Sequence, residues 1–426
     1  MTEKIAAGDQ DISYSHRIIS TPHDFQAFCR ALRGCPRLAL DTEFVAEDSY
    51  HPNLCLVQVA LDNELVLIDP FPLGSVSAFW ETIVGEDVET VVHAGHVDLQ
   101  FCYFATGRFP PRVFDVQIAA GLAGADYPSG LTNLIQKYVG DFSPQHETQS
   151  DWRRRPLSEW QIVYALDDVR FLLRLRDRLD AILAGLGRRS WLGEEVVRHQ
   201  HEIQKRQESE RWQRLAGHRA LSARELAILR ELWLWREERA SYQNVPARRI
   251  LRDDLLVELA KRKTGDVKRI LAVRGMNFRH IRPWIPDIAE RIRRALAIPE
   301  ENLPRPERRE GVSQSPLVGQ FLFTALGSLC RRGEISVGLV GSTQDIRDWV
   351  SYRLGEGDEE PPLMAQGWRR ELIGDLFDRL LSGKAAIRIR DAKSDHPLEF
   401  VEIPDEEPPA DSGAAEGCRQ DRRPAP

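Results

Sequence analysis

Two acidic residues, Asp41 and Glu43, stand one residue apart in the segment LALDTEF (38–44). The apolar residues before them predict a buried strand, and side chains two residues apart on a strand point to the same face of a sheet. Two carboxylates on one buried face repel each other, and burying them is unfavourable unless a cation compensates the charge. A lone pair of this kind also fits a turn cap and a surface ion pair. The pair therefore indicates a metal site only if further acids converge on it.

Two further acids and a tyrosine are spaced so that they can join that pair. Asp98 follows a predicted strand at the start of a helix, and Asp168 lies four residues after Tyr164 on one helix face. Taken singly, Asp98 also fits a helix-dipole charge and Asp168 a solvated acid. Together, four carboxylates offer the oxygen ligands that Mg²⁺ or Mn²⁺ prefers, and two such ions can clamp a phosphoryl group during transfer. A tyrosine hydroxyl can orient the attacking water, so the set predicts metal-dependent hydrolysis of a phosphodiester.

The elements that must position these residues follow an α/β pattern. Strands are expected at 37–44, 54–62, 64–70 and 88–95, the middle two joined by a tight hairpin. Ser158 and Gln161 form a capping box before the helix that carries Tyr164 and Asp168. This order predicts a mixed sheet with flanking helices over the first 190 residues. From Ser222 onward the pattern is that of amphipathic helices.

Composition fits a globular protein that acts on a polyanion. The chain has 426 residues, of which 42% are hydrophobic, and it has no apolar run long enough to span a membrane. Its six cysteines show no CxxC spacing, which argues against a zinc site and for a reducing, cytoplasmic location. Residues 1–170 contain 12 Lys and Arg against 24 Asp and Glu, whereas residues 211–300 contain 21 against 11. An acidic part can hold metal ions and a basic part can hold nucleic acid, although helix surfaces also differ in charge for no functional reason.

The segments LDTEF, HAGHVDL and QSDWRRRPLSEWQIVYALDDVRFLL together resemble the three exonuclease motifs of the ribonuclease D family, which belongs to the DEDD 3′–5′ exonucleases. The resemblance implies an RNase H-like α/β fold and two divalent metal ions, Mg²⁺ or Mn²⁺. It implies metal ligands at Asp41, Glu43, Asp98 and Asp168, and a catalytic tyrosine at Tyr164. The Tyr-x-x-x-Asp spacing is typical of the tyrosine subclass of these enzymes.

The resemblance also divides the chain into parts. Residues 222–281 resemble an HRDC domain, a helical module of helicases and ribonuclease D proteins. The expected organisation is an exonuclease domain (14–190), a helical linker (191–217), an all-α HRDC domain (218–298), a smaller and mainly helical HRDC-like C-terminal domain (316–403) and a disordered tail (404–426). Two basic groups are candidates for RNA binding, or else are solvated surface charges: Arg153, Arg154 and Arg155, and Lys261, Arg262, Lys263, Lys268 and Arg269.

The expected function is a metal-dependent 3′–5′ exoribonuclease that trims the 3′ ends of structured RNAs and releases nucleoside 5′-monophosphates. The preference for tRNA precursors follows from the resemblance alone. Such a protein needs no membrane, and we expect a monomer. A DNA exonuclease of repair is the first alternative, because discrimination at the 2′-hydroxyl cannot be located in the sequence. A non-catalytic RNA-binding protein is the second, and it predicts a missing acid, whereas all four are present.

Overall fold

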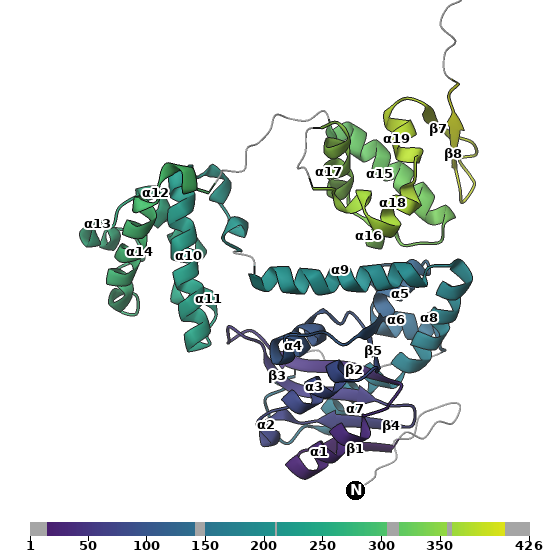
Figure 1. Cartoon of the computed structure of the whole chain (residues 1–426), viewed down its shortest axis with the longest axis horizontal. Helices are drawn as coiled ribbons and strands as arrows, with labels where there is room; N and C mark the ends of the chain where they lie inside the picture. Colours follow the sequence, from purple (N-terminus) through teal and green to yellow (C-terminus); the bar gives the residue numbers. More distant parts are fainter. Residues whose placement is uncertain (1–14, 141–149, 209–210, 305–314, 356–359, 405–426) are drawn as a thin grey trace, which may run out of the picture.

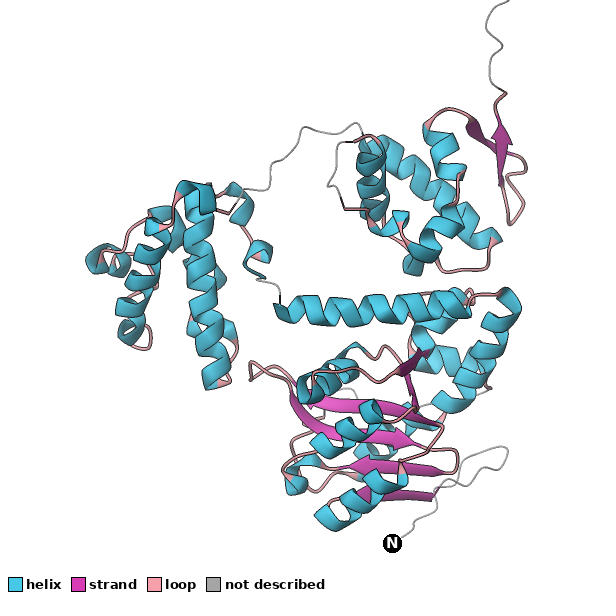
Figure 2. Ribbon diagram, in the orientation of Figure 1, coloured by secondary structure: helices cyan, strands magenta, loops and turns pink. Residues whose placement is uncertain are grey.

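The computed structural model describes residues 15–140, 150–208, 211–304, 315–355 and 360–404. They form a sheet region at the N-terminus, a central helical region and a C-terminal region (Figure 1). All strands of the described residues belong to the sheet region except one hairpin near the C-terminus (Figure 2). Among these residues, no helix is long and apolar enough to cross a membrane.

The sheet region contains one mixed sheet of six strands in the order β1-β4-β3-β2-β5-β6. Strand β3 runs antiparallel to both of its neighbours, β2 and β4, and the other pairs are parallel. The four strands expected from the sequence are present, and β1 and β6 are two additional short strands. The strands are β1 (Ser15–Ile19), β2 (Arg37–Val45), β3 (Asn53–Ala60), β4 (Glu64–Ile68), β5 (Glu89–Val92) and β6 (Arg112–Asp115).

Helices cover both faces of this sheet (Figure 1). On one face, α1 and α3 enclose a core of Phe28, Phe79 and Ile83 with the strands. On the other face, α5, α7 and α8 bury Leu166, Val169 and similar residues. The helices of this region are α1 (Pro22–Ala31), α2 (Pro70–Leu73), α3 (Ser77–Gly85), α4 (His96–Thr106), α5 (Val116–Leu122), α6 (Leu131–Tyr138), α7 (Glu159–Arg170) and α8 (Leu172–Leu186).

The segment expected to be a linker is largely one long helix, α9 (Arg189–Glu208), between the sheet region and the C-terminal region (Figure 1). Its Leu192 and Val196 are buried in a core that both regions share. The helix therefore packs as part of the core. The domain boundaries given above stay predictions.

The central helical region has a hydrophobic core of its own, built around the long helix α10. Ser222 caps α10 in a capping box with Glu225, and Asn244 ends it in the left-handed conformation. The helices are α10 (Ala223–Gln243), α11 (Ala247–Ile250), α12 (Asp253–Arg262), α13 (Val267–Leu271) and α14 (Ile285–Ala297).

The C-terminal region is mainly helical and ends in the antiparallel hairpin of β7 (Ala385–Ile389) and β8 (Leu398–Glu402). Its buried Trp368 stacks on Trp191 of α9, with ring centroids 5.2 Å apart. The helices are α15 (Ser315–Arg332), α16 (Val337–Val340), α17 (Thr343–Arg353), α18 (Gly367–Ile373) and α19 (Leu376–Leu381). The tail from residue 405 onward lies outside the described residues.

Candidate active site

Three of the predicted ligands converge beneath helix α7. Asp41 and Glu43 lie on β2, next to the central strand β3, and both point to the face that α7 covers. Asp168 comes down from α7. Each of the three offers one carboxylate oxygen, and these oxygens all lie within 4.8 Å of one another. Side chains alternate along β2, which places Asp41 and Glu43 on one face, and α7 adds Asp168 from above that face. The acid cluster predicted from the sequence is formed in this way.

The position of α7 is fixed from its N-terminal side. Arg155 donates to Asp69 at 2.5 Å and to the carbonyl of Cys55 at 2.7 Å, which ties the segment before α7 to the ends of β3 and β4. The predicted capping box is present, because the Gln161 N–H donates to Ser158 Oγ and the Ser158 N–H donates back to Gln161. Helix α7 therefore starts at a defined point, and Tyr164 and Asp168 follow at fixed positions.

Tyr164 lies against the cluster and is held by an aromatic neighbour. The Trp152 ring lies 6.1 Å from the Tyr164 ring. Burial raises the pKa of the Tyr164 hydroxyl, and the nearby charges of Asp168, Glu43 and Asp41 raise it further. The hydroxyl therefore stays protonated at neutral pH and can act as a hydrogen-bond donor at the cluster.

Asp98 joins the cluster electrostatically but is oriented by a different contact. It is 5% exposed in the first turn of α4 and accepts a hydrogen bond of 2.6 Å from Thr42 Oγ1. The turn before α4 is held by Asp115, which accepts the N–H of Gly95 at 3.0 Å. A side chain at Gly95 would collide with Val92, so this turn requires glycine. Asp98 is not one of the three acids whose oxygens meet within 4.8 Å.

Burial raises the pKa values of all four carboxyl groups, and repulsion within the cluster adds to this for Asp41 and Glu43. Burial raises the pKa of Glu43 to about 8, with added repulsion from Asp168 and Asp98. Burial raises the pKa of Asp168 to about 7, and that of Asp98 to about 6 against the lowering effect of its bond with Thr42. Burial also raises the pKa of Asp41 well above its ordinary value, and Asp98, Asp168 and Glu43 add to this.

The donor set fits a hard divalent cation. Three carboxylate oxygens are grouped closely, and none of the four acids forms an ion pair with a basic side chain in the described ranges. Grouped, partly buried carboxylates without a basic partner are unfavourable as anions unless a cation lies among them. Asp167, one position along α7, differs, because it pairs with Arg170 at 2.8 Å.

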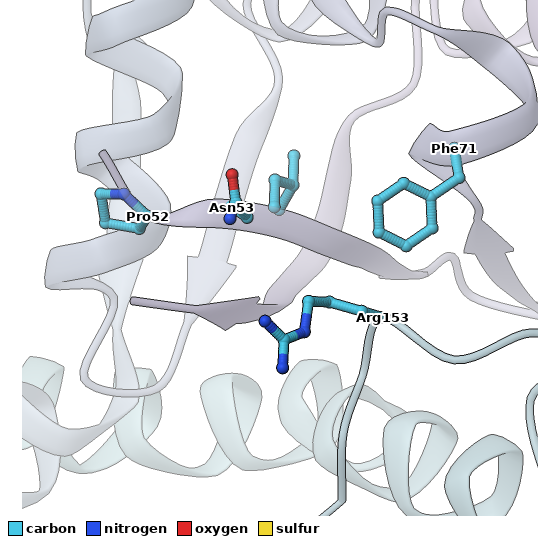
Figure 3. Close-up of a pocket in the computed structure, with 5 residues that line it drawn as sticks. Pro52, Asn53, Phe71 and Arg153 are labelled. Atoms are coloured by element: carbon cyan, nitrogen blue, oxygen red, sulfur yellow. The ribbon is translucent and has the colours of Figure 1, made fainter. Parts of the chain in front are cut away.

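A pocket of about 490 Å³ lies beside the segment that leads into α7. It is lined by Pro52, Asn53, Leu54, Phe71 and Arg153 (Figure 3). The Phe71 ring is 45% exposed, and the guanidinium of Arg155 lies 4.7 Å from its centroid. Arg153, which lines the pocket, directly follows Trp152 in the sequence, and the Trp152 ring contacts Tyr164. The pocket and the acid cluster are therefore linked through two consecutive residues.

The loop between β2 and β3 connects the sheet region to the central helical region. Asp48 pairs with Arg153 at 3.4 Å on one side and with Arg249 at 2.8 Å on the other. Tyr50 donates to Glu237 of α10 at 2.9 Å, and the N–H of His51 donates to Asn244 at 3.1 Å. The strand that carries Asp41 and Glu43 thus leads directly into the contact with the helical region.

Comparison with known proteins identifies the sheet region and the central helical region of the chain. Residues 16–184 match the 3′–5′ exonuclease family, and residues 225–292 match the HRDC domain. Ribonuclease D of Gluconacetobacter diazotrophicus is 33% identical over 87% of this chain and 94% of its own length. Ribonuclease D of Jannaschia sp. is 32% identical over 90% of this chain and 99% of its own length. This chain belongs to the ribonuclease D family.

The family assignment agrees with the observed fold. The crystal structure of Escherichia coli RNase D, described as an exoribonuclease involved in structured RNA processing, superimposes with a TM-score of 0.75. It is 26% identical and covers 86% of this chain and 99% of that one. The chain is thus a 3′–5′ exoribonuclease with an α/β exonuclease fold, an HRDC domain and a further, mainly helical C-terminal portion, as the sequence predicted.

The predicted RNA-binding arginines and lysines of this ribonuclease D occupy different environments. Arg154 is exposed, and Arg153 pairs with Asp151 at 2.8 Å. The guanidinium of Arg155 donates its hydrogen bonds to Asp69 and to backbone carbonyls. The five basic residues of the HRDC domain that were predicted to bind RNA are exposed at the end of α12 and along α13. Lys263 pairs with Glu225 and Arg262 with Glu258. Their contact with RNA stays a prediction.

Some residues of the site carry no sequence signal. Thr42 stands between the two predicted acids and points to the opposite face, and only the fold brings its hydroxyl to Asp98. Phe71 follows a strand as one more apolar residue, and its exposure beside Arg155 is visible only in the structure.

Proposed function

We propose that this ribonuclease D trims the 3′ ends of structured RNAs, tRNA precursors in particular, in the cytoplasm and as a monomer. Asp41, Glu43, Asp98 and Asp168 would hold two divalent ions, Mg²⁺ or Mn²⁺, and the products would be nucleoside 5′-monophosphates. The observation that supports the site most strongly is the meeting of Asp41, Glu43 and Asp168 oxygens within 4.8 Å beside Tyr164. The RNA preference follows from the family and from the role stated for the Escherichia coli enzyme.

The residues of the chain would divide the work between them. Bound ions would activate water and stabilise the charge of the transferring phosphate. Tyr164, kept protonated by its surroundings and packed by Trp152, would donate a hydrogen bond to the scissile phosphate or to the attacking water. Thr42 would hold Asp98 in one orientation. Because the cluster lies beneath α7, the terminal nucleotide must be unpaired to reach it.

Replacing Tyr164 by Phe is expected to lower kcat about 100-fold, because the change removes a single donor at the reacting phosphate. The KM for RNA and the affinity for Mn²⁺ are expected to stay unchanged. Tyr138→Phe is the matched control, since it deletes another buried hydroxyl of the same domain, one with no hydrogen-bond partner among the described residues. Steady-state kinetics on a 5′-labelled RNA measures both variants. Equal losses of activity in both would contradict a specific role for Tyr164.

The pocket lined by Phe71 and Arg153 would hold a nucleotide upstream of the scissile bond. An exposed aromatic ring with a guanidinium nearby is a common platform for single-stranded RNA. Phe71→Ala is expected to raise KM by about 5- to 100-fold, the usual effect of losing one stacked base. The value of kcat should change little. Fluorescence anisotropy with a labelled single-stranded RNA measures the affinity, and Phe104→Ala, which removes another exposed ring of the domain, is the control.

The experiment that tests the proposed function compares two substrates. A tRNA with a 3′ extension and a single-stranded DNA of the extension's sequence, each 5′-labelled, are incubated with Mg²⁺ or Mn²⁺. A ladder of shortened RNA that disappears with chelator, with the DNA degraded more slowly, is the expected result. Faster loss of the DNA would favour a repair exonuclease. Binding of both without shortening would instead indicate a non-catalytic RNA-binding protein.

A further inference from the structure

Gln58 on β3 is a buried amide without a partner. Its side chain is completely buried, and neither Oε1 nor Nε2 forms a hydrogen bond with any described residue. A buried amide left unpaired destabilises a fold by roughly 1–3 kcal/mol. Such groups are rare in protein cores, and each one asks for an explanation. A methionine or leucine would fill this place in the core without that penalty.

Asp41 is the polar residue directly opposite Gln58 in the sheet, and Glu43 stands diagonally from Gln58 on the same face. Asp41 and Gln58 face each other in the antiparallel pair of β2 and β3, so their side chains lie on the same face with Cβ atoms about 5 Å apart. The other neighbours on this face are apolar and fully buried: Leu56 and Ala60 along β3, and Leu67 across on β4. Among the described residues, no side-chain donor hydrogen-bonds to the Asp41 carboxylate. The unpaired Gln58 amide therefore faces a carboxylate that accepts a backbone hydrogen bond from Thr42 but none from a side chain.

We propose that Gln58 is a positioning residue of the exonuclease reaction, whose Nε2–H donates to the Asp41 carboxylate in the metal-bound site. This inference rests on the proposed function. The hydrogen bond would fix the orientation of the Asp41 carboxylate, and it would give the buried Nε2–H of Gln58 an acceptor. Partners of this kind orient metal ligands, and removing one typically lowers metal affinity or activity 10- to 100-fold.

The test replaces Gln58 by Met, which keeps the length of the side chain and removes both polar atoms. Titration calorimetry of the full chain with Mn²⁺ is expected to show a Kd about 10- to 100-fold higher than that of the wild type. The value of kcat on RNA should fall, while KM should not change. The unfolding temperature of the metal-free protein should stay the same or rise, because an unpaired buried amide is gone. Gln58→Leu provides a second variant if Gln58→Met does not fold.

Thr90→Val is the matched control. Thr90 is also completely buried with an unpaired hydroxyl, but it pairs with Leu38 on β2 and thus faces the opposite side of the sheet from Asp41. This variant should bind Mn²⁺ like the wild type. Unchanged Mn²⁺ affinity in both Gln58 variants would overturn the inference alone, and so would a drop in metal-free stability, which would assign Gln58 a structural role. If the wild type bound no Mn²⁺, the proposed function would fail together with the inference.

Discussion

Asp41→Asn is expected to abolish exonuclease activity and to stabilise the metal-free protein at the same time. The substitution keeps the shape of the side chain and removes one ligand charge, so activity should fall by at least about 1,000-fold. Stability should rise because a buried carboxylate that repels Glu43, Asp98 and Asp168 is gone. Activity on 5′-labelled RNA and thermal unfolding in chelator measure the two effects. A stabilised but inactive variant is the pattern expected of a functional site.

The gain in stability should depend on pH. The Asp41 pKa is higher in the folded than in the unfolded state, so the protonated group favours folding. The contribution of Asp41 to the stability of the wild type is therefore fully present below the ordinary aspartate pKa and is lost as pH rises through the folded value. The difference in unfolding temperature between Asp41→Asn and wild type should be small at pH 4 and grow toward pH 8. A difference that stays constant over this range would contradict a repelling cluster.

Asp167→Asn is the control for this prediction. Asp167 precedes Asp168 on α7 but pairs with Arg170 instead of joining the cluster. Near wild-type activity in Asp167→Asn beside an inactive Asp41→Asn would separate the cluster from the general charge of the helix. Equal losses of activity in the two variants would mean that the cluster acids have no specific role in the reaction.

Arg369→Ala is expected to lower the free energy of unfolding by about 3 kcal/mol, the lower end of the usual effect of breaking a buried ion pair, because Glu195 keeps Arg198 as a partner. Arg369 donates to Glu195 of α9 at 2.7 and 3.0 Å and to the carbonyls of Val340 and Leu339. The two side chains are 4% and 1% exposed. Burial alone would raise the pKa of Glu195, but the bonds from Arg369 and Arg198 lower it to about 2. Urea unfolding measures the loss.

Two further variants complete this experiment. Arg370→Ala removes the adjacent, exposed arginine and should leave the unfolding midpoint unchanged. Replacing Glu195 and Arg369 together by Met should recover most of the stability, because the buried pair as a whole is close to neutral compared with apolar packing. If the double variant were as unstable as Arg369→Ala, packing and not the unpaired charge would account for the loss.

The sequence predicted the strand and the helix that carry the acid cluster because their signals are local. Alternation placed Asp41 and Glu43 on one face, the capping box marked the start of α7, and helical spacing paired Tyr164 with Asp168. Strand β6 escaped notice because its four residues, RVFD, include only two apolar ones and show no clear strand pattern. The additional bond of Asp98 with Thr42 joins residues 56 positions apart, and no spacing rule reveals it.

The contacts of the C-terminal region could not be predicted for the same reason. The segment Gly367–Arg370 contains no motif in the sequence that assigns it a role. In the structure, Trp368 stacks on Trp191, Arg369 pairs with Glu195, and Gly367 has a φ of 49° where a side chain would meet Glu194. These partners are more than 170 residues away in the chain. The segment therefore fastens the C-terminal region to α9.

The central claim is that the acid cluster beneath α7 acts on the terminal phosphodiester of RNA through bound metal ions. The most direct measurement uses a 5′-labelled RNA whose last phosphodiester carries sulfur in place of one non-bridging oxygen. We expect the sulfur to slow removal of the terminal nucleotide strongly in Mg²⁺, and Mn²⁺, which accepts sulfur more readily, to restore the rate. The same slow rate with both ions, or no effect of the sulfur with either, would contradict metal contact with the scissile phosphate.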